Sequence, residues 1–123
     1  MTNADQFRNK KYLNLETYRK NGTPVLTPMW FAEQEGVFYV YSVAEVGKVK
    51  RIRSNPNVRV APCDIRGEIE GEWVAGIARI ENDRGTELAN RLLVRKYGIL
   101  KRIGNLFSKL TGRKRVVISI RFE

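Results

Sequence analysis

The stretch NGTPVLTPMWFAEQEGVFYVYSVAEVGKVKRIRSNP, residues 21–56, decides the fold of this 123-residue chain. The Asn-Gly pair at 21–22 is the strongest short signal for a hairpin turn, and it opens a strand predicted from Pro24 to about Ala32. Glu35-Gly36 turns the chain back into a second run, Val37 to Val43, whose valines and aromatic residues are typical of a strand. A short cationic helix is expected next, ended by Asn55-Pro56.

The end of this stretch combines features that suit an anion. Ser42 closes the second strand, and Lys48, Lys50 and Arg51 lie near the start of the predicted helix. Amide groups at a helix N-terminus, together with nearby lysine or arginine, favour a phosphate group. Taken singly, each cation is better explained as part of a solvated helix face. Their grouping after Ser42 favours an anion site beside an apolar strand surface.

Composition limits the class of protein. The length favours a single domain, 1–123, and the net charge of +10 favours anionic partners such as nucleic acid, acidic membrane or a phosphorylated small molecule. The sequence has no His, which is the commonest general base and a common metal ligand. It has one cysteine, Cys63, so neither an intrachain disulfide nor a thiolate zinc cluster can form, and no metal site is expected. The first residues do not resemble a signal peptide, and no run is long enough to span a bilayer, so a cytoplasmic protein is expected.

The remaining segments alternate between strand and helix patterns. A helix capped by Asp83 is predicted to run to Gly98, with an amphipathic segment from Ile99 to Gly112 after it. Short connections and evenly spaced strands predict an α+β fold, mainly β, with five or six antiparallel strands in a closed or split barrel. The other expected elements are a short helix over Asp5–Lys10 anchored by Phe7, and strands over Tyr12–Lys20, Asn57–Ile65, Trp73–Glu81 and Val116–Phe122.

Three features leave alternatives open. Pro28 within a strand marks either a sheet edge or a bulge beside a binding site. Gly76 and Ala78 on one strand face allow the close approach of a ligand or of another backbone segment. From Arg91 to Arg115 there are nine Lys or Arg and no acidic residue. That run could contact lipid headgroups or nucleic acid, but it lacks interleaved aromatic residues, so a cationic outer face without specific nucleic-acid binding is favoured.

Several motifs, in their order and spacing, resemble a known superfamily from about Phe7 to Phe122. It is the split-barrel flavin reductase and oxidase superfamily typified by pyridoxamine 5'-phosphate oxidase, and the chain is similar to its branch of deazaflavin-dependent enzymes. The matching motifs are Gly22-Thr-Pro24, Thr27-Pro28-Met-Trp30-Phe31, Ser42, Lys48-x-Lys50-Arg51-Ile52-x-x-Asn55-Pro56 and Gly76-x-Ala78.

The resemblance implies a six-stranded antiparallel split β-barrel, with a short helix after the third strand and a helical pair before the last. It further implies a homodimer with two cofactors at the subunit interface. The cofactor is expected to be FMN or, alternatively, the deazaflavin coenzyme F-420. By resemblance, Leu26, Thr27, Pro28, Met29 and Trp30 line its ring system, Ser42, Lys48 and Lys50 hold its phosphate with help from Arg51, and Trp73 and Gly76 face it.

Two departures from the superfamily bear on function. The substrate-binding Arg and His residues of true pyridoxamine phosphate oxidases have no counterpart, so oxidation of pyridoxamine phosphate is not expected. Many relatives carry Asn at the position of Arg51, and the extra cation suits a more anionic cofactor.

The expected function is therefore hydride transfer to or from a small organic substrate by an FMN- or deazaflavin-dependent oxidoreductase. No catalytic side chain is required, because the cofactor carries the hydride. The alternatives are a flavin- or deazaflavin-binding protein without turnover, and a basic module that binds nucleic acid or a membrane surface.

Overall fold

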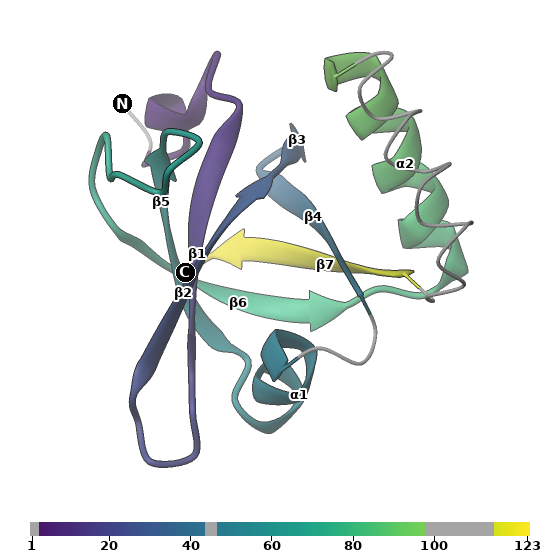
Figure 1. Ribbon diagram of the computed structural model, residues 1–123. Helices are drawn as coiled ribbons and strands as arrows, with labels where there is room; N and C mark the ends of the chain where they lie inside the picture. Colours follow the sequence, from purple (N-terminus) through teal and green to yellow (C-terminus); the bar gives the residue numbers. More distant parts are fainter. Residues whose placement is uncertain (1–2, 44–46, 98–114) are drawn as a thin grey trace.

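The computed structural model describes residues 3–43, 47–97 and 115–123 of the chain (Figure 1). A 3-10 helix, two α-helices and seven strands make up these residues. In chain order they are η1 (Asn3–Phe7), β1 (Tyr12–Tyr18), β2 (Pro24–Trp30), β3 (Ala32–Gln34), β4 (Val37–Val43), α1 (Gly47–Ser54), β5 (Asn57–Cys63), β6 (Val74–Ile80), α2 (Asp83–Tyr97) and β7 (Arg115–Phe122).

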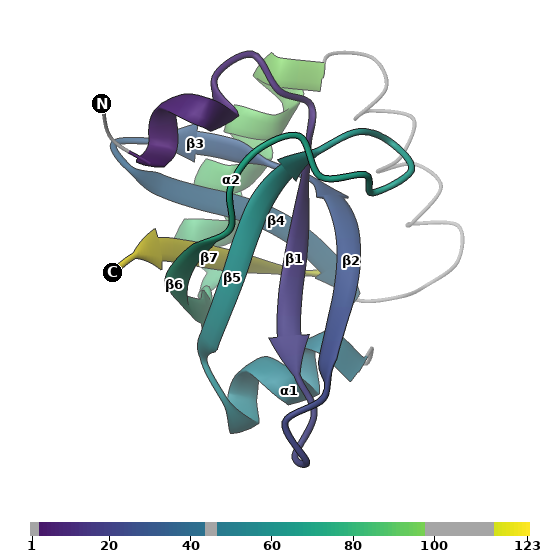
Figure 2. The ribbon, with the colours of Figure 1, turned by 90° about the vertical axis from the view of Figure 1, so that its left-hand side faces the viewer.

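The strands form one antiparallel sheet in the order β2-β1-β5-β6-β7-β4-β3. The sheet curls into a half-barrel, with β1, β2 and β5 running across β4 and β7 (Figure 2). The predicted split barrel is thus confirmed, with seven strands rather than six. The strand predicted from Pro24 to Ala32 breaks at Phe31, and its two parts lie at opposite edges of the sheet. The predicted second helical segment, Ile99–Gly112, lies outside the described residues.

The inner face of the sheet carries the main core, and helices close it. Phe7 of η1 packs edge-on against Phe31 and Phe38, with ring centroids 5.8 and 5.0 Å apart, so the expected anchor role of Phe7 is confirmed. At the other end, α1 packs on β1 and β6 and buries Val49 and Ile52, as their spacing predicts. The aliphatic strand residues that this core buries fully are Leu13, Leu15, Val40, Val58, Val60, Ile118 and Ile120.

Phe31 is the point where the chain crosses from one sheet edge to the other. Its backbone groups lie between two strands, and α2 supplies partners for them: the Tyr97 hydroxyl accepts the Phe31 N–H at 3.0 Å. The same hydroxyl lies 2.8 Å from the Phe31 carbonyl oxygen and 2.5 Å from that of Lys11, either of which can accept its proton. Lys96 Nζ also donates to the Phe31 carbonyl, at 2.9 Å. Because buried backbone groups need partners, the end of α2 stabilises this crossing.

Local backbone geometry confirms one predicted turn and corrects one predicted helix cap. Glu35 and Gly36 have φ of 52° and 82°, which fits the predicted tight hairpin between β3 and β4. The predicted cap of α2, Asp83, is wrong by one residue. Asn82 Oδ1 accepts the Gly85 N–H at 3.1 Å, and the Asn82 carbonyl accepts the Thr86 N–H at 2.9 Å. Asn and Asp are similarly good caps, so the sequence alone does not separate them.

The positions of Pro28 and Gly76 in the sheet show which of the alternative explanations applies to each residue. β2 is an edge strand, so Pro28 is placed where a missing N–H costs little. Gly76 is buried on β6, and a Cβ there would lie 2.9 Å from the Arg121 carbonyl oxygen and 3.0 Å from Ile120 Cγ2. The close neighbour of Gly76 is therefore the backbone of β7, which explains the need for glycine at this position.

The Tyr97 contacts lead to a stability prediction. Tyr97→Phe removes the hydroxyl and leaves the Phe31 N–H and the Lys11 carbonyl without this partner. We expect the free energy of unfolding to fall by about 1–3 kcal/mol, the usual cost of orphaning buried polar groups. Tyr12→Phe is the matched control, since no hydrogen bond of the Tyr12 hydroxyl is seen among the described residues. Urea unfolding that gives both variants the same stability would contradict this role for Tyr97.

Candidate functional site

The first turn of α1 brings two cations together over backbone amides. Residues three apart on a helix share a face, so Lys48 and Arg51 lie side by side. The Arg51 side chain folds back over the start of the helix: a Cβ on Gly47 would lie 2.6 Å from its Nη1. Gly47 leaves this space free. A guanidinium beside the positive end of a helix is unfavourable unless an anion joins it.

The charges around this turn repel one another. Burial lowers the pKa of Lys48, and the neighbouring Arg51 lowers it further. Burial and then Arg19, in the β1–β2 hairpin, lower the pKa of Arg51. Arg51 is held by a hydrogen bond of 2.7 Å from its Nε to the hydroxyl of Thr17, which is almost fully buried in β1.

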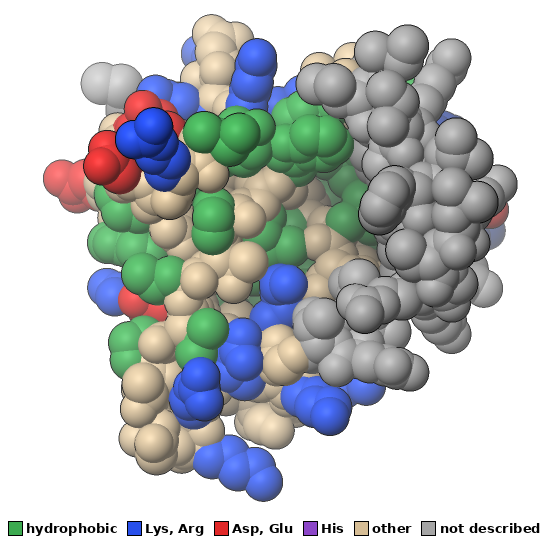
Figure 3. Space-filling view, in the orientation of Figure 1, with side chains coloured by type: hydrophobic (Ala, Val, Ile, Leu, Met, Phe, Trp, Pro, Cys, Tyr) green, Lys and Arg blue, Asp and Glu red, His purple; other side chains and the backbone are tan. Residues whose placement is uncertain are grey.

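Within the described parts of the chain, no carboxylate lies within ion-pair distance of Lys48, Arg51 or Arg19. We call Arg19, Lys48 and Arg51 with Thr17 the α1 cluster. Lys and Arg side chains gather on the lower part of the molecular face where Figure 1 places α1 and the β1–β2 hairpin (Figure 3). Among the described residues, the α1 cluster is therefore a positive site without a compensating carboxylate, and it is suited to a phosphate or another compact anion.

The other residues expected at the phosphate lie differently. Lys50 is exposed on α1, away from the face shared by Lys48 and Arg51. Ser42 is buried at 7% exposure on β4, where it follows Val40 along the inner face and is engaged in an interaction of its own. The structure thus brings Lys48 and Arg51 together and keeps Lys50 apart from them.

The residues expected to line a ring system divide between the two faces of β2. Thr27 and Met29 pair with Leu15 and Leu13 and share the inner face with them. Both are only half-buried, whereas Leu13 and Leu15 are fully buried, so the inner face of β2 is partly open.

Leu26 and Pro28 are on the outer face of β2 and are exposed, Leu26 at 51%. Trp30 stacks on the Tyr97 ring at a centroid distance of 4.6 Å and an interplanar angle of 10°. No single surface of the chain collects all five residues from Leu26 to Trp30.

Trp73 and Gly76 also lie on opposite sides of the sheet. Gly76 shares the inner face with its partner Val58. Trp73 contacts the guanidinium of Arg59, 5.2 Å from the ring centroid, on the outer side. Arg59 in turn binds the nearly buried Glu16 through two hydrogen bonds of 2.6 and 2.9 Å, and this pairing lowers the pKa of Glu16.

Sequence reasoning missed two members of the α1 cluster. Thr17 was an ordinary alternating residue of a predicted strand, and Arg19 one cation of a hairpin end. Both reach α1 through the packing of that helix on β1. The only available signal was a hydroxyl on the strand face shared with Leu13 and Leu15, where a polar group needs a partner.

Comparison with known proteins assigns the family. The family described as Pyridoxamine 5'-phosphate oxidase matches residues 2–123. The chain belongs to this family. No curated protein matches the chain. Solved structures similar to this family member share its fold at low sequence identity.

Three of these structures illustrate the range of relatives. A FAD-binding protein from Mesorhizobium loti has 20% identity and a TM-score of 0.69, with 98% of this chain and 84% of that chain covered. A protein described as F420 reductase has 21% identity and a TM-score of 0.62, with 98% and 92% covered. A heme storage protein from Vibrio cholerae has 15% identity and a TM-score of 0.73, with 97% and 86% covered. At these identities the likeness establishes the split-barrel fold.

Other kinds of site have little support in the described part of this family member. No group of three or more His, Cys, Asp or Glu side chains there could hold a metal ion. Cys63 is buried, and burial raises the pKa of its thiol to about 11, which disfavours a reactive thiolate. No helix there is both long and apolar enough to cross a membrane. The α1 cluster remains the best candidate for binding chemistry.

The α1 cluster predicts stabilisation by inorganic phosphate. At ten times its dissociation constant, a bound anion stabilises the folded state by about 1.4 kcal/mol, which raises the unfolding midpoint by several degrees. Lys48→Met should abolish this rise, while its own midpoint without phosphate stays equal or increases because repulsion with Arg51 is relieved. The measurement is thermal unfolding in phosphate against chloride of equal ionic strength. Arg53→Met, on the exposed side of α1, is the control and should keep the full rise.

Proposed function

We propose that this protein is an FMN- or deazaflavin-dependent oxidoreductase whose cofactor phosphate binds at the α1 cluster. The observation that supports this most directly is the pair Lys48 and Arg51 at the start of α1, without a carboxylate partner among the described residues. The family and its similar structures, which include a FAD-binding protein and an F420 reductase by description, favour a flavin-type cofactor. The arrangement of the residues fits such a group, since the anion site adjoins an apolar strand face.

Each part of the chain has a distinct role in this proposal. Lys48 and Arg51 bind the phosphate, with Thr17 orienting Arg51, and Ser42 and Lys50 stay proposed helpers. The half-buried Thr27 and Met29 on the inner face of β2 contact the ring system and exclude water from it. The cofactor, when bound, supplies the hydride chemistry to or from a small organic substrate. The cytoplasmic location expected from the sequence stays a prediction.

The cofactor-binding proposal is tested by a pair of variants on one helix. A charge-assisted hydrogen bond to phosphate contributes about 1.5–3 kcal/mol, so Lys48→Ala should weaken binding of FMN or F-420 by about ten- to a hundredfold. Arg53→Ala should leave the affinity unchanged. Fluorescence titration of both cofactors measures the effect and also shows which is preferred. If Lys48→Ala binds both as tightly as the parent protein, the phosphate does not lie at the α1 cluster.

Turnover is a separate part of the proposal. The bound cofactor can be photoreduced without oxygen, and its reoxidation followed after small quinones or nitroaromatic acceptors are added. An oxidoreductase should accelerate reoxidation by at least one acceptor over the rate of free reduced cofactor. Equal rates for the whole series would favour the alternative of a cofactor-binding protein without turnover.

We further propose a homodimer with the cofactor at the subunit interface. The outer face of the sheet exposes Leu26 at 51% and Ile77 at 42%, and it also carries Pro28 and Trp73. An interface that places this face of one subunit against the open inner face of β2 in the other would bring those side chains to the cofactor bound there.

The dimer predicts a specific outcome in solution. A stable dimer buries on the order of 1,600 Å² in total, so light scattering should give twice the chain mass at micromolar concentration. Leu26→Glu should shift the protein towards the monomer, because it places a charge in an apolar contact. Arg53→Glu is the control charge change outside the proposed interface. A parent protein that is monomeric at these concentrations would contradict the proposal.

A further inference from the structure

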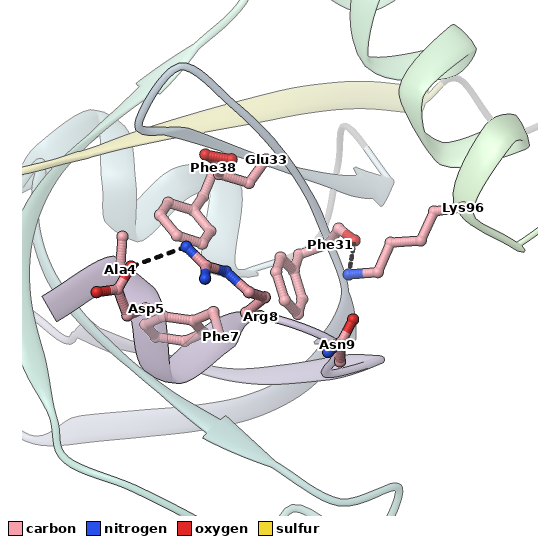
Figure 4. Close-up of a pocket in the computed structure, with 9 residues that line it drawn as sticks. All are labelled: Ala4, Asp5, Phe7, Arg8, Asn9, Phe31, Glu33, Phe38 and Lys96. Carbon is pink, nitrogen blue, oxygen red and sulfur yellow. Dashed lines mark hydrogen bonds and ion pairs between the residues drawn. The ribbon is translucent and has the colours of Figure 1, made fainter. Parts of the chain in front are cut away.

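A pocket lies at the other end of the barrel from α1. It has a volume of about 250 Å³ and is lined by η1 and the turn after it, by Phe31 and β3, by β4, and by Lys96 near the end of α2 (Figure 4). Phe7, Phe31 and Phe38, whose rings pack on one another, belong to its lining and are only 1–3% exposed. Figure 2 places η1 and α1 at opposite ends of the sheet, so this η1 pocket is separate from the α1 cluster.

Lys96 is the polar group in this pocket with the most capacity to bind. Its ammonium lies 3.4 Å from the centroid of the Phe31 ring, and one of its N–H groups donates to the Phe31 carbonyl. In the described regions it has no carboxylate within ion-pair distance. Burial lowers its pKa to about 8, with Glu33 acting in the opposite direction. The ammonium group has three N–H donors, and one of them is used by the Phe31 carbonyl. The other two can donate to a bound anion while the Phe31 ring stabilises the positive charge.

The remaining charged groups of the η1 pocket are already engaged. Arg8, whose side chain is largely exposed, pairs with Asp5 at 3.2 Å (Figure 4). Glu33 accepts the Gly36 N–H at 3.2 Å. The carboxylates of Asp5 and Glu33 oppose a doubly charged ligand, whereas Lys96 can accept a single negative charge.

We propose that the η1 pocket binds a small aromatic molecule with one ring and one carboxylate. The volume is below the roughly 300–1,000 Å³ typical of sites for drug-sized ligands, so a flavin ring system is too large and a single ring fits. The ring packs edge-to-face or offset against the small exposed parts of the three phenylalanines, and the carboxylate binds the N–H groups of Lys96 that have no partner among the described residues. This site is additional to the proposed cofactor site and does not depend on it.

The test uses 4-fluorobenzoate as the probe, followed by fluorine NMR on the full-length protein. We expect saturable binding to the parent protein and about tenfold weaker binding to Lys96→Met, which keeps the length of the side chain and loses its charge. Lys20→Met, in the exposed β1–β2 hairpin, is the matched control and should bind as the parent does. Lys96→Met should still fold, because Tyr97 can donate to the same Phe31 carbonyl.

A second variant leaves Lys96 in place. Ala4 lines the η1 pocket and packs against the core, so Ala4→Leu should fill the space and abolish binding. Uncharged 4-fluorobenzyl alcohol should bind at least tenfold more weakly than the benzoate, and cyclohexanecarboxylate should compete poorly with it. Equal affinity of Lys96→Met and parent, equal affinity of the alcohol, or full binding by a folded Ala4→Leu would overturn the proposal.

Saturating FMN or F-420 distinguishes this site from the proposed cofactor site. We expect 4-fluorobenzoate to bind with unchanged affinity when the cofactor is present. Displacement by either cofactor would mean that the probe occupies the cofactor site, and the η1 pocket would then not be a second site. Absence of cofactor binding would contradict the proposed function only, since the probe would still report on the η1 pocket.

Discussion

The crossing at Phe31 is the constraint on which the rest of the structure depends. A seven-stranded antiparallel sheet has two free edges, and here one continuous segment, β2–Phe31–β3, supplies both of them. The bend places Phe31 in the core and leaves its peptide groups outside any strand pairing. Tyr97 and Lys96 at the end of α2 bind those groups, so the helix that covers β3 and β7 also fixes the curvature of the sheet. Curvature in turn determines where the two ends of the barrel lie.

Those two ends differ in electrostatics. At one, α1 concentrates cations around a helix N-terminus, where repulsion is relieved by a strongly charged group. At the other, η1 and the β3–β4 hairpin surround aromatic rings with charges of both signs, which suits a weakly charged and more apolar group. A chain with a net charge of +10 thus does not present one uniform positive surface. The candidate sites are marked by cations that lack a carboxylate partner among the described residues, and the total charge does not reveal which cations these are.

Much of the fold could be predicted because its signals are local. The turns at Gly22 and Gly36, the strand Val37–Val43 and the buried face of α1 follow from residue type and spacing within a few positions. The break at Phe31 could not be predicted, since it depends on Tyr97, 66 residues later in the chain.

The candidate site likewise has a part that could be predicted from local spacing and a part that could not. Lys48 and Arg51 are neighbours by helical periodicity, whereas Thr17 joins them only through tertiary packing. The division of residues 26–30 between two faces follows from strand alternation, but resemblance to a family does not say which face a ligand uses.

The prolines of β2 have a consequence beyond the shape of one molecule. Pro24 and Pro28 lack N–H groups, and β3, at the opposite edge, is only three residues long and bears the charged Glu33. Neither edge is a good template for a strand from another chain. Fibril-like growth by continued sheet extension is therefore suppressed at both margins, although the outer sheet surface exposes Leu26 and Ile77. Any association between copies is thereby directed away from the strand edges, because neither edge offers an unbroken row of free N–H groups to a strand of another chain.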